Sequence, residues 1–211
     1  MPKLLIVEND SFAGTFMSKS LDSAGFSIIS VADTAPIAMK TLRETSPDCA
    51  LIDIELGIGP NGIDIACAFR KLKPSIGIVF LTSIVDPRLI DLKGLELPEG
   101  SIYLSKSFVS DTSEISESLH ESMRLAKDKS SPCIIRYPKS QLQLTNGQFE
   151  LIRLIADGLS NKEIARKKFV TLKSTENSIA RLAKKLDLKD TNTNSQRVLI
   201  AKRYFQMIGK V

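Results

Sequence analysis

The sequence predicts an α/β chain in two parts: a doubly wound parallel sheet of the (βα)5 type, and then an all-α region of four helices. Over residues 1–127, five short apolar runs alternate with five amphipathic stretches. Beyond residue 143, apolar residues recur at helical spacing only. The charge divides as well: residues 1–127 carry 12 Lys and Arg against 17 Asp and Glu, and residues 128–211 carry 17 against 7. An acidic part joined to a basic part indicates two domains with different partners, the basic one suited to a polyanion.

Runs of β-branched and apolar residues predict five buried strands in the acidic part. They are Lys3–Val7, Phe26–Val31, Cys49–Asp53, Ile76–Leu81 and Ser101–Leu104. The stretches after them predict helices at Ser11–Ala24, Ala35–Glu44, Gly62–Leu72, Pro87–Gly94 and Thr112–Lys127. Asp86 before Pro87, and Asp111 with Glu114, have the spacing of helix starts.

The basic part begins after a stretch rich in Lys, Ser, Pro and Gln. We therefore expect one domain over 1–127, a linker over 128–143 and a second domain over 144–211. Helical periodicity predicts Gly147–Asp157, Asn161–Lys168, Leu172–Leu186 and Ser195–Ile208. Thr145 with Gln148 and Ser160 with Glu163 fit capping boxes, and Gly158 suits the end of the first of these helices.

Composition excludes several classes. No apolar run reaches the twenty or so residues that span a bilayer, and the N-terminus turns acidic at Glu8 without the apolar core of a signal peptide. We expect a cytoplasmic protein without membrane contact. Cys49, Cys67 and Cys133 are odd in number and widely spaced, which favours inert thiols over a disulfide or a zinc site. No serine or cysteine triad is indicated, and the lone His120 is expected at the surface.

Polar residues follow the predicted strands at the edge where such sheets bind ligands. Glu8, Asn9 and Asp10 follow the first strand, Asp53 closes the third, Thr82 follows the fourth and Lys106 follows the fifth. A carboxylate attacks phosphorus readily only when a cation screens the phosphoryl charge, and hard oxygen ligands suit Mg²⁺. A lysine and a hydroxyl can hold the remaining phosphoryl oxygens. Solvated strand ends are the plainer explanation for any one residue, but less so for all of them together.

The first 127 residues resemble the receiver domain of two-component response regulators. The matching strings are Leu-Leu-Ile-Val-Glu-Asn-Asp, Leu-Ile-Asp-Ile-Glu-Leu around Asp53, Asn-Gly-Ile-Asp, Phe-Leu-Thr-Ser and Tyr-Leu-Ser-Lys. The resemblance implies that Asp53 is the phospho-acceptor, with Lys106 and Thr82 at the phosphoryl group. It implies a switch pair of Thr82 and Tyr103, and a Mg²⁺ site formed by Glu8, Asn9, Asp53 and the main-chain carbonyl of Glu55.

Two residues depart from the family pattern. Asn9 stands where the family carries an aspartate, so one negative charge is lost and the affinity for Mg²⁺ should fall. Ser107 stands where a proline usually follows the lysine, and a cis bond there is costlier without proline.

Residues 144 to about 208 resemble the NarL/LuxR-type helix-turn-helix domain, most specifically in the string Gly-Leu-Ser-Asn-Lys-Glu-Ile-Ala. In the third helix Thr175, Ile179, Leu182 and Leu186 share an inward face. The opposite face is polar and basic, as a helix in a DNA major groove requires. The expected DNA-binding residues are Lys173, Ser174, Asn177, Arg181 and Lys184, with Lys167 and Lys168 at backbone phosphates. Glu176 and Ala180 stand where relatives often carry basic residues, so the target sequence is not transferable.

The leading prediction is a transcription factor, not an enzyme, that binds double-stranded DNA and is switched when a sensor histidine kinase phosphorylates Asp53. A homodimer is expected when active, through apolar residues of the last helix. The alternative is an atypical receiver regulated by a protein or ligand without phosphorylation, which Asn9 motivates. A phosphatase with Asp53 as nucleophile and Glu55 as acid is disfavoured, because such enzymes place that motif on the first strand.

Overall fold

The computed structural model describes residues 1–90, 96–128, 131–136, 144–188 and 193–210. It divides the chain into two compact units. The first unit comprises Met1–Thr82 and Leu92–Pro138, and the second comprises Ser83–Asp91 and Lys139–Val211. The predicted fold class is confirmed, with a parallel sheet and alternating helices in the first unit and four helices in the C-terminal region.

The sheet of the first unit is parallel throughout, with the strand order β2-β1-β3-β4-β5-β6. Its strands are β1 (Lys3–Val7), β2 (Ser27–Ala32), β3 (Cys49–Ile52), β4 (Gly77–Thr82), β5 (Ile102–Ser105) and β6 (Ile134–Arg136). Every residue of β3, β4 and β5 is buried. This is the pattern of strands covered on both faces, and it explains why they are continuously apolar.

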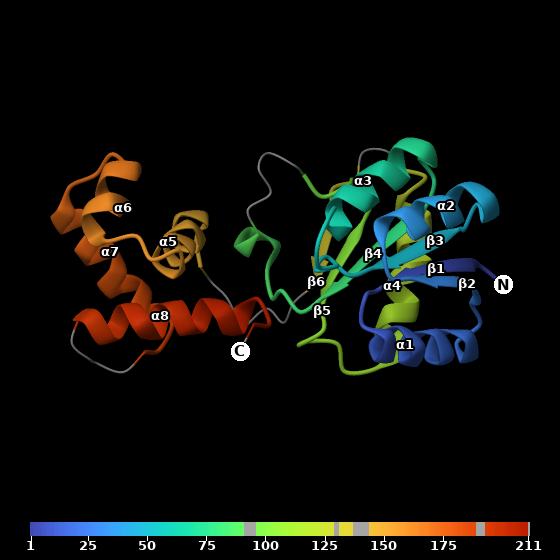
Figure 1. The fold of residues 1–211 in the computed structure, drawn as a ribbon, viewed down its shortest axis with the longest axis horizontal. Coiled ribbons are helices and arrows are strands. Elements are labelled where there is room, and N and C mark those ends of the chain that lie inside the picture. Colours follow the sequence, from blue (N-terminus) through green and yellow to red (C-terminus); the bar gives the residue numbers. More distant parts are fainter. Residues whose placement is uncertain (91–95, 129–130, 137–143, 189–192, 211) are drawn as a thin grey trace. The chain divides into compact units, whose positions relative to one another are not determined.

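Four helices cover the sheet: α1 (Ser11–Ser23), α2 (Ala35–Thr45), α3 (Gly62–Leu72) and α4 (Thr112–Leu125). Helices α1 and α4 contact each other on one face, and α2 and α3 contact each other on the other face (Figure 1). The core under α1 and α4 includes Leu4, Ile6, Leu51 and Leu119, each at most 2% exposed. The sheet and the helices on its two faces therefore form three layers.

The register of the strands brings their carboxyl ends to one edge. Val7 of β1 pairs with Ile52 of β3, and Thr82 of β4 pairs with Ser105 of β5. Glu8, Asp53 and Lys106 are the residues that directly follow β1, β3 and β5. They therefore lie at the same edge of the sheet.

The strands differ from the sequence prediction in their ends and in their number. Strands β2, β4 and β5 begin and end one residue later than predicted, so Thr82 is the last residue of β4 rather than the residue after it. Strand β3 ends at Ile52, so Asp53 follows this strand instead of closing it. A sixth strand, β6, forms within the predicted linker and pairs with β5.

The helix predicted over Pro87–Gly94 is wrong. Pro87–Leu89 form a single 3-10 turn, and Ile90 is extended at φ −85° and ψ 134°. The remainder of that prediction, residues 91–94, lies outside the described residues.

The C-terminal helices are α5 (Asn146–Ala156), α6 (Asn161–Lys167), α7 (Leu172–Lys185) and α8 (Thr193–Met207). The capping boxes predicted at Thr145 and Ser160 are confirmed, and Gly158 takes a positive φ of 83° after α5. Asp111 caps α4 through the amides of Ser113 and Glu114, but the Glu114 carboxylate reaches back to Ser110 rather than closing a box.

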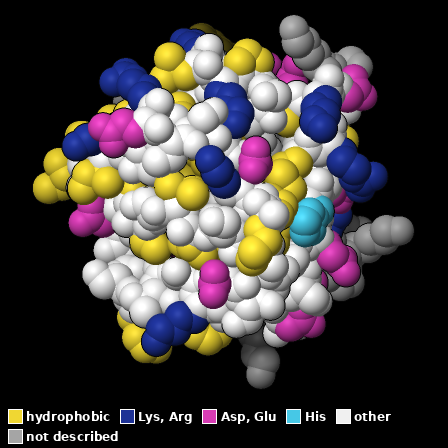
Figure 2. Space-filling model, turned by 90° about the vertical axis from the view of Figure 1, so that its right-hand side faces the viewer, with side chains coloured by type: hydrophobic (Ala, Val, Ile, Leu, Met, Phe, Trp, Pro, Cys, Tyr) yellow, Lys and Arg dark blue, Asp and Glu magenta, His cyan; other side chains and the backbone are white. Residues whose placement is uncertain are grey.

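Figure 2 shows one face of the first unit, where hydrophobic and charged side chains are interspersed and His120, the one histidine of the chain, is at the surface. Its ring lies 4.9 Å from that of Phe26. All three cysteines are free. Burial, and then the neighbouring Asp48, raise the pKa of the Cys49 thiol to about 12, which keeps it unreactive. Within the described part of the chain, no helix is long and apolar enough to cross a membrane.

Candidate functional site

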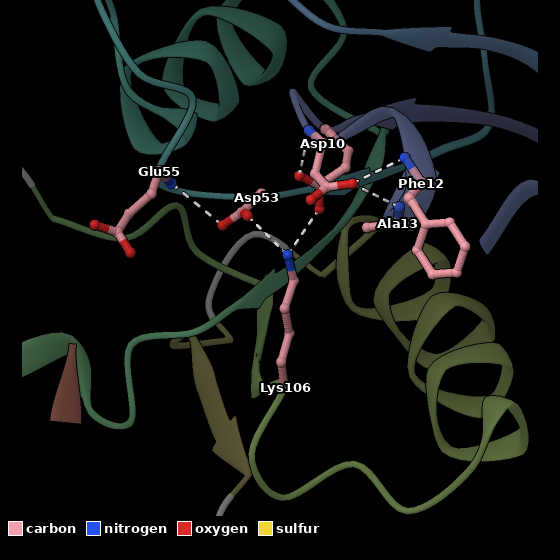
Figure 3. Close-up of polar contacts among 7 residues, drawn as sticks. Asp10, Phe12, Ala13, Asp53, Glu55 and Lys106 are labelled. Atoms are coloured by element: carbon pink, nitrogen blue, oxygen red, sulfur yellow. Dashed lines mark hydrogen bonds and ion pairs between the residues drawn. The ribbon is translucent and has the colours of Figure 1, made fainter. Parts of the chain in front are cut away.

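Lys106 joins two buried carboxylates at the carboxyl edge of the sheet. Its Nζ donates to Oδ2 of Asp53 and to Oε2 of Glu8, each at 2.8 Å (Figure 3). Glu8 is 3% exposed and Asp53 is 8% exposed. Burial lowers the pKa of Lys106, but the hydrogen bonds to Asp53 and Glu8 outweigh it, so this pKa lies above its ordinary value. The lysine therefore stays charged and holds the two acids side by side.

The loop after β3 positions Asp53. Its Oδ1 accepts from the backbone N–H of Glu55 at 3.2 Å. Gly62, the first residue of α3, lies against the same strand end: a Cβ at Gly62 would be 2.0 Å from the main-chain oxygen of Asp53. Only glycine permits this approach. The sequence analysis placed Gly62 at the start of a helix and within the matching string Asn-Gly-Ile-Asp, but assigned it no role beside Asp53.

The three polar residues after β1 have separate roles. Glu8 points to Lys106, whereas Oδ1 of Asp10 accepts from the amides of Phe12 and Ala13 and so caps α1 (Figure 3). Asn9 is exposed. Asp10 is thus committed to the helix and does not replace the carboxylate that Asn9 lacks.

The oxygen donors of this pocket suit a hard cation. Glu8 and Asp53 share one ammonium and so lie close together, and carboxylates are the ligands that Mg²⁺ takes while keeping several waters. Among the residues that the structure describes, however, no three His, Cys, Asp or Glu side chains gather to hold a metal ion. Glu8 and Asp53 are thus suitable ligands for magnesium, but Asn9 supplies an amide oxygen where the family carries a third carboxylate.

The two predicted switch residues lie on adjacent strands. Thr82 ends β4 fully buried, and its main-chain oxygen accepts from the backbone N–H of Lys106 at 2.8 Å. Tyr103 of β5 is also fully buried, with its ring 6.4 Å from that of Phe80. The ring of Tyr103 is thus part of the core, and Thr82 is hydrogen bonded to the backbone of Lys106.

In the second unit, α7 has one buried and one exposed face. Thr175, Ile179 and Leu182 are at most 2% exposed. Thr171 caps the helix through the amide of Ser174. The opposite face exposes Lys173, Asn177, Arg181 and Lys184. Leu186, predicted to point inward, is half-buried at the end of the helix.

The remaining predicted DNA contacts have different environments. Lys167 is exposed, but Lys168 forms an ion pair with Glu150. Ser174 and Arg181 line a cavity of about 300 Å³ together with Lys168. The Nε of Arg181 donates to the main-chain oxygen of Asn177 at 3.3 Å, so this side chain lies along the helix. The ion pair of Lys168 was not visible in the sequence, because its partner is 18 residues away.

Comparison with known families identifies both parts of the chain. Residues 4–117 match the model of the response regulator receiver domain, and residues 142–195 match that of the bacterial regulatory proteins of the luxR family. The transcriptional regulatory protein LnrK of Bacillus subtilis is 26% identical over 194 residues, which cover 84% of this chain and 85% of that protein. The response regulator VraR of Staphylococcus aureus (strain NCTC 8325) is 23% identical over 195 residues, which cover 89% and 91%.

Solved structures agree on the fold. An RcsB–DNA complex matches with a TM-score of 0.58 at 16% identity, covering 98% of each chain. Salmonella typhimurium RcsB matches with a TM-score of 0.55 at 16% identity, covering 96% of this chain and 98% of that one. The chain therefore belongs to the response regulators, with a receiver domain followed by a LuxR-type DNA-binding domain, a family of transcription regulators and not of enzymes.

Proposed function

We propose that this protein controls transcription by binding double-stranded DNA and that a sensor histidine kinase switches it by phosphorylating Asp53. The observation that carries the proposal is the contact of Lys106 with both Asp53 and Glu8, two carboxylates that are buried at the carboxyl edge of the sheet. A buried carboxylate beside a second acid and a fixed ammonium is the arrangement that accepts a phosphoryl group.

The transfer needs few groups. A carboxylate oxygen of Asp53 attacks the phosphorus of a phosphohistidine, a P–O bond replaces the P–N bond, and the released imidazole takes up a proton. Lys106 and the hydroxyl of Thr82 would hold the phosphoryl oxygens. A Mg²⁺ ion held by Glu8, Asp53, Asn9 and the main-chain carbonyl of Glu55 would supply charge neutralisation.

The DNA-binding role of the second unit rests on α7. Its exposed face carries three cations and Asn177, the side chains that reach phosphates, guanine and adenine in a major groove. The RcsB structure of similar fold holds DNA, and another contains two RcsB dimers bound to two parallel DNAs.

We infer a homodimer here as well, with Val198 and Phe205 of α8, which are 67% and 37% exposed, as apolar contacts. We also place the protein in the cytoplasm, because the proposed kinase would draw its phosphoryl group from ATP there.

The test is intact-mass measurement after incubation with acetyl phosphate and Mg²⁺. We expect the mass of one phosphoryl group on the wild type and on Asp33→Asn, an exposed matched control, but none on Asp53→Asn. DNA selected from a random library should then bind more tightly in the presence of beryllofluoride and Mg²⁺. An unmodified wild type that is folded by circular dichroism would remove phosphorylation from the function.

A second candidate is an atypical receiver that responds to a protein or ligand. It is favoured by the charges around Lys106. Asn9 is neutral and Asp10 caps a helix, so the carboxylates beside Lys106 are Glu8 and Asp53, and the lysine balances one of their two charges. Little negative charge is left to attract a metal ion. An absent phosphoryl mass together with unchanged DNA binding in beryllofluoride would select this candidate.

A further inference from the structure

A cavity of about 300 Å³ lies beside α7 in the second unit. Its lining residues come from α5, α6 and α7 and the turns that join them, so the whole cavity lies within this one unit. The volume is at the lower end of the range that small-molecule sites occupy. We call this space the α7 cavity.

A glycine at the start of α5 leaves the α7 cavity open. Gly147 lines the cavity, and a Cβ at Gly147 would meet nothing within 4 Å among the described residues outside its own turn of helix. The φ of Gly147 is not positive, so the backbone does not require glycine at this position. The side chain of Gln148 is held elsewhere, since its Oε1 accepts from the amide of Thr145 at 2.9 Å. The space is therefore the one structural consequence of this glycine that the fold shows.

The inner wall of the α7 cavity is formed by buried side chains. Leu151 of α5 is 3% exposed and Ile164 of α6 is fully buried. Thr175 of α7 is also buried, and its hydroxyl already donates to the main-chain oxygen of Thr171 at 3.3 Å. An apolar group bound here would leave water without separating a polar group from its partner, so its burial would stabilise the complex.

The outer wall carries positive charge. Lys168 and Arg181 line the cavity, and of the described residues that line it none is acidic. Lys168 pairs with Glu150, which lies outside the lining. Nε of Arg181 donates to the main-chain oxygen of Asn177 at 3.3 Å, and the terminal nitrogens of a guanidinium are the donors that suit a carboxylate. The cavity is thus complementary to an anion.

We propose that the α7 cavity binds a small organic anion with an apolar body, of the class of aromatic carboxylates, and that the bound anion competes with DNA for Arg181. The buried wall takes the ring, and the two cations take the carboxylate. Arg181 also belongs to the exposed face of α7, with Lys173, Asn177 and Lys184. The competition rests on the DNA-binding role proposed for this face, whereas binding of the anion does not. The DNA-binding unit thereby has a chemical input of its own, independent of Asp53.

Amide NMR of the isotope-labelled full chain, titrated with cinnamate, tests the binding. We expect saturable shift changes at Gly147, Leu151 and Ser174, with a Kd on the order of 1 mM for a ligand of this size. The neutral analogue cinnamamide should bind about tenfold more weakly, because the cations lose their partner. Absence of saturable shifts at these residues would overturn the proposal. Equal shifts with inorganic phosphate would also overturn it, since the cavity would then be a subsite for a DNA phosphate alone.

Two variants separate the space from the charge. Gly147→Leu fills the cavity and should abolish cinnamate binding without lowering the thermal stability, because leucine favours a helix more than glycine does. Arg181→Gln keeps the space and should weaken cinnamate binding about tenfold. Arg166→Gln, an exposed site on α6 outside the cavity, is the matched control and should bind as the wild type. Wild-type affinity in both cavity variants would contradict the proposal.

Fluorescence anisotropy with a library-selected duplex tests the competition. Cinnamate at four times its Kd should weaken DNA binding about fivefold if the two ligands exclude each other. Sodium acetate at the same ionic strength controls for the effect of salt. The DNA affinity of Gly147→Leu should not respond to cinnamate. An unchanged affinity of the wild type, with the cavity shown by NMR to be occupied, would overturn the competition. A wild type that binds no duplex even without cinnamate would instead count against the proposed function.

Discussion

Nζ of Lys106 lies 2.8 Å from Oδ2 of Asp53, and the same ammonium is 2.8 Å from Oε2 of Glu8. The pKa of Lys106 is raised above the ordinary 10.5, so the folded chain holds this proton more tightly than the unfolded chain does. A raised lysine pKa contributes stability that is complete below the ordinary pKa and is lost as the pH rises through the folded value. The contacts of Lys106 with Asp53 and Glu8 therefore stabilise the receiver at neutral pH.

Lys106→Met should lower the free energy of unfolding by about 2 kcal/mol, because it leaves two nearly buried carboxylates without a counter-charge. The loss should be the same at pH 7 and pH 9, since the wild-type lysine is charged at both. Urea unfolding followed by circular dichroism measures it. Lys19→Met, an exposed site on α1, controls for the loss of one charge. A difference that disappears at pH 9 would contradict the sign of the shift.

Asn9→Asp should tighten Mg²⁺ binding about fivefold, from roughly 1 kcal/mol of added attraction at an exposed position. It should also speed modification by acetyl phosphate. Isothermal titration with MgCl₂ gives the affinity. Ser23→Asp adds the same charge at the exposed end of α1 and should leave the affinity near that of the wild type.

Asp10→Ala should destabilise the first unit by about 1 kcal/mol, the usual cost of removing a helix cap. Because the Asp10 side chain faces the amides of Phe12 and Ala13, its removal should change Mg²⁺ affinity much less than Glu8→Gln does. Unfolding and metal titration of both variants provide the comparison. An equal loss of metal affinity in both would assign Asp10 to the metal.

Asn177→Ala and Lys184→Gln should weaken DNA binding in different ways. Loss of a base contact at Asn177 should cost about 1–3 kcal/mol and relax the preference at one base pair. Loss of a phosphate contact at Lys184 should weaken all duplexes alike and reduce the slope of log affinity against log salt by about 1. Anisotropy with library-selected duplexes measures both. Lys162→Gln, an exposed site on α6, is the control.

Glu163 should titrate below its ordinary range, because the Ser160 hydroxyl and amide donate to its carboxylate. A depressed carboxyl pKa contributes stability that is present above the ordinary value of 4.5 and is lost as the pH falls through the folded value. Carbon-detected NMR titration reports this pKa, and Ser160→Ala should raise it. An unchanged pKa in that variant would show that the capping hydroxyl has no influence.

The strands and the pocket residues were predictable from the sequence for one physical reason. Strands buried on both faces are continuously apolar, and parallel topology sends their carboxyl ends to one edge, so Glu8, Asp53 and Lys106 could be grouped without coordinates. Helix caps are equally local, and those at Thr145 and Ser160 were confirmed. The short strand β6 was missed because two isoleucines and an arginine in a stretch of Lys, Ser, Pro and Gln are too weak a signal.

The sequence by itself determined the fold class, the capped helices and the residues at the strand ends, because each depends on neighbours within a few residues. Tertiary structure alone decided that Ile90 is extended with its carbonyl bonded to Arg153, although Asp86 and Pro87 signalled a helix. It also decided that Lys168 pairs with Glu150. These outcomes depend on partners far along the chain, and the packing energy of such contacts exceeds local helix preference.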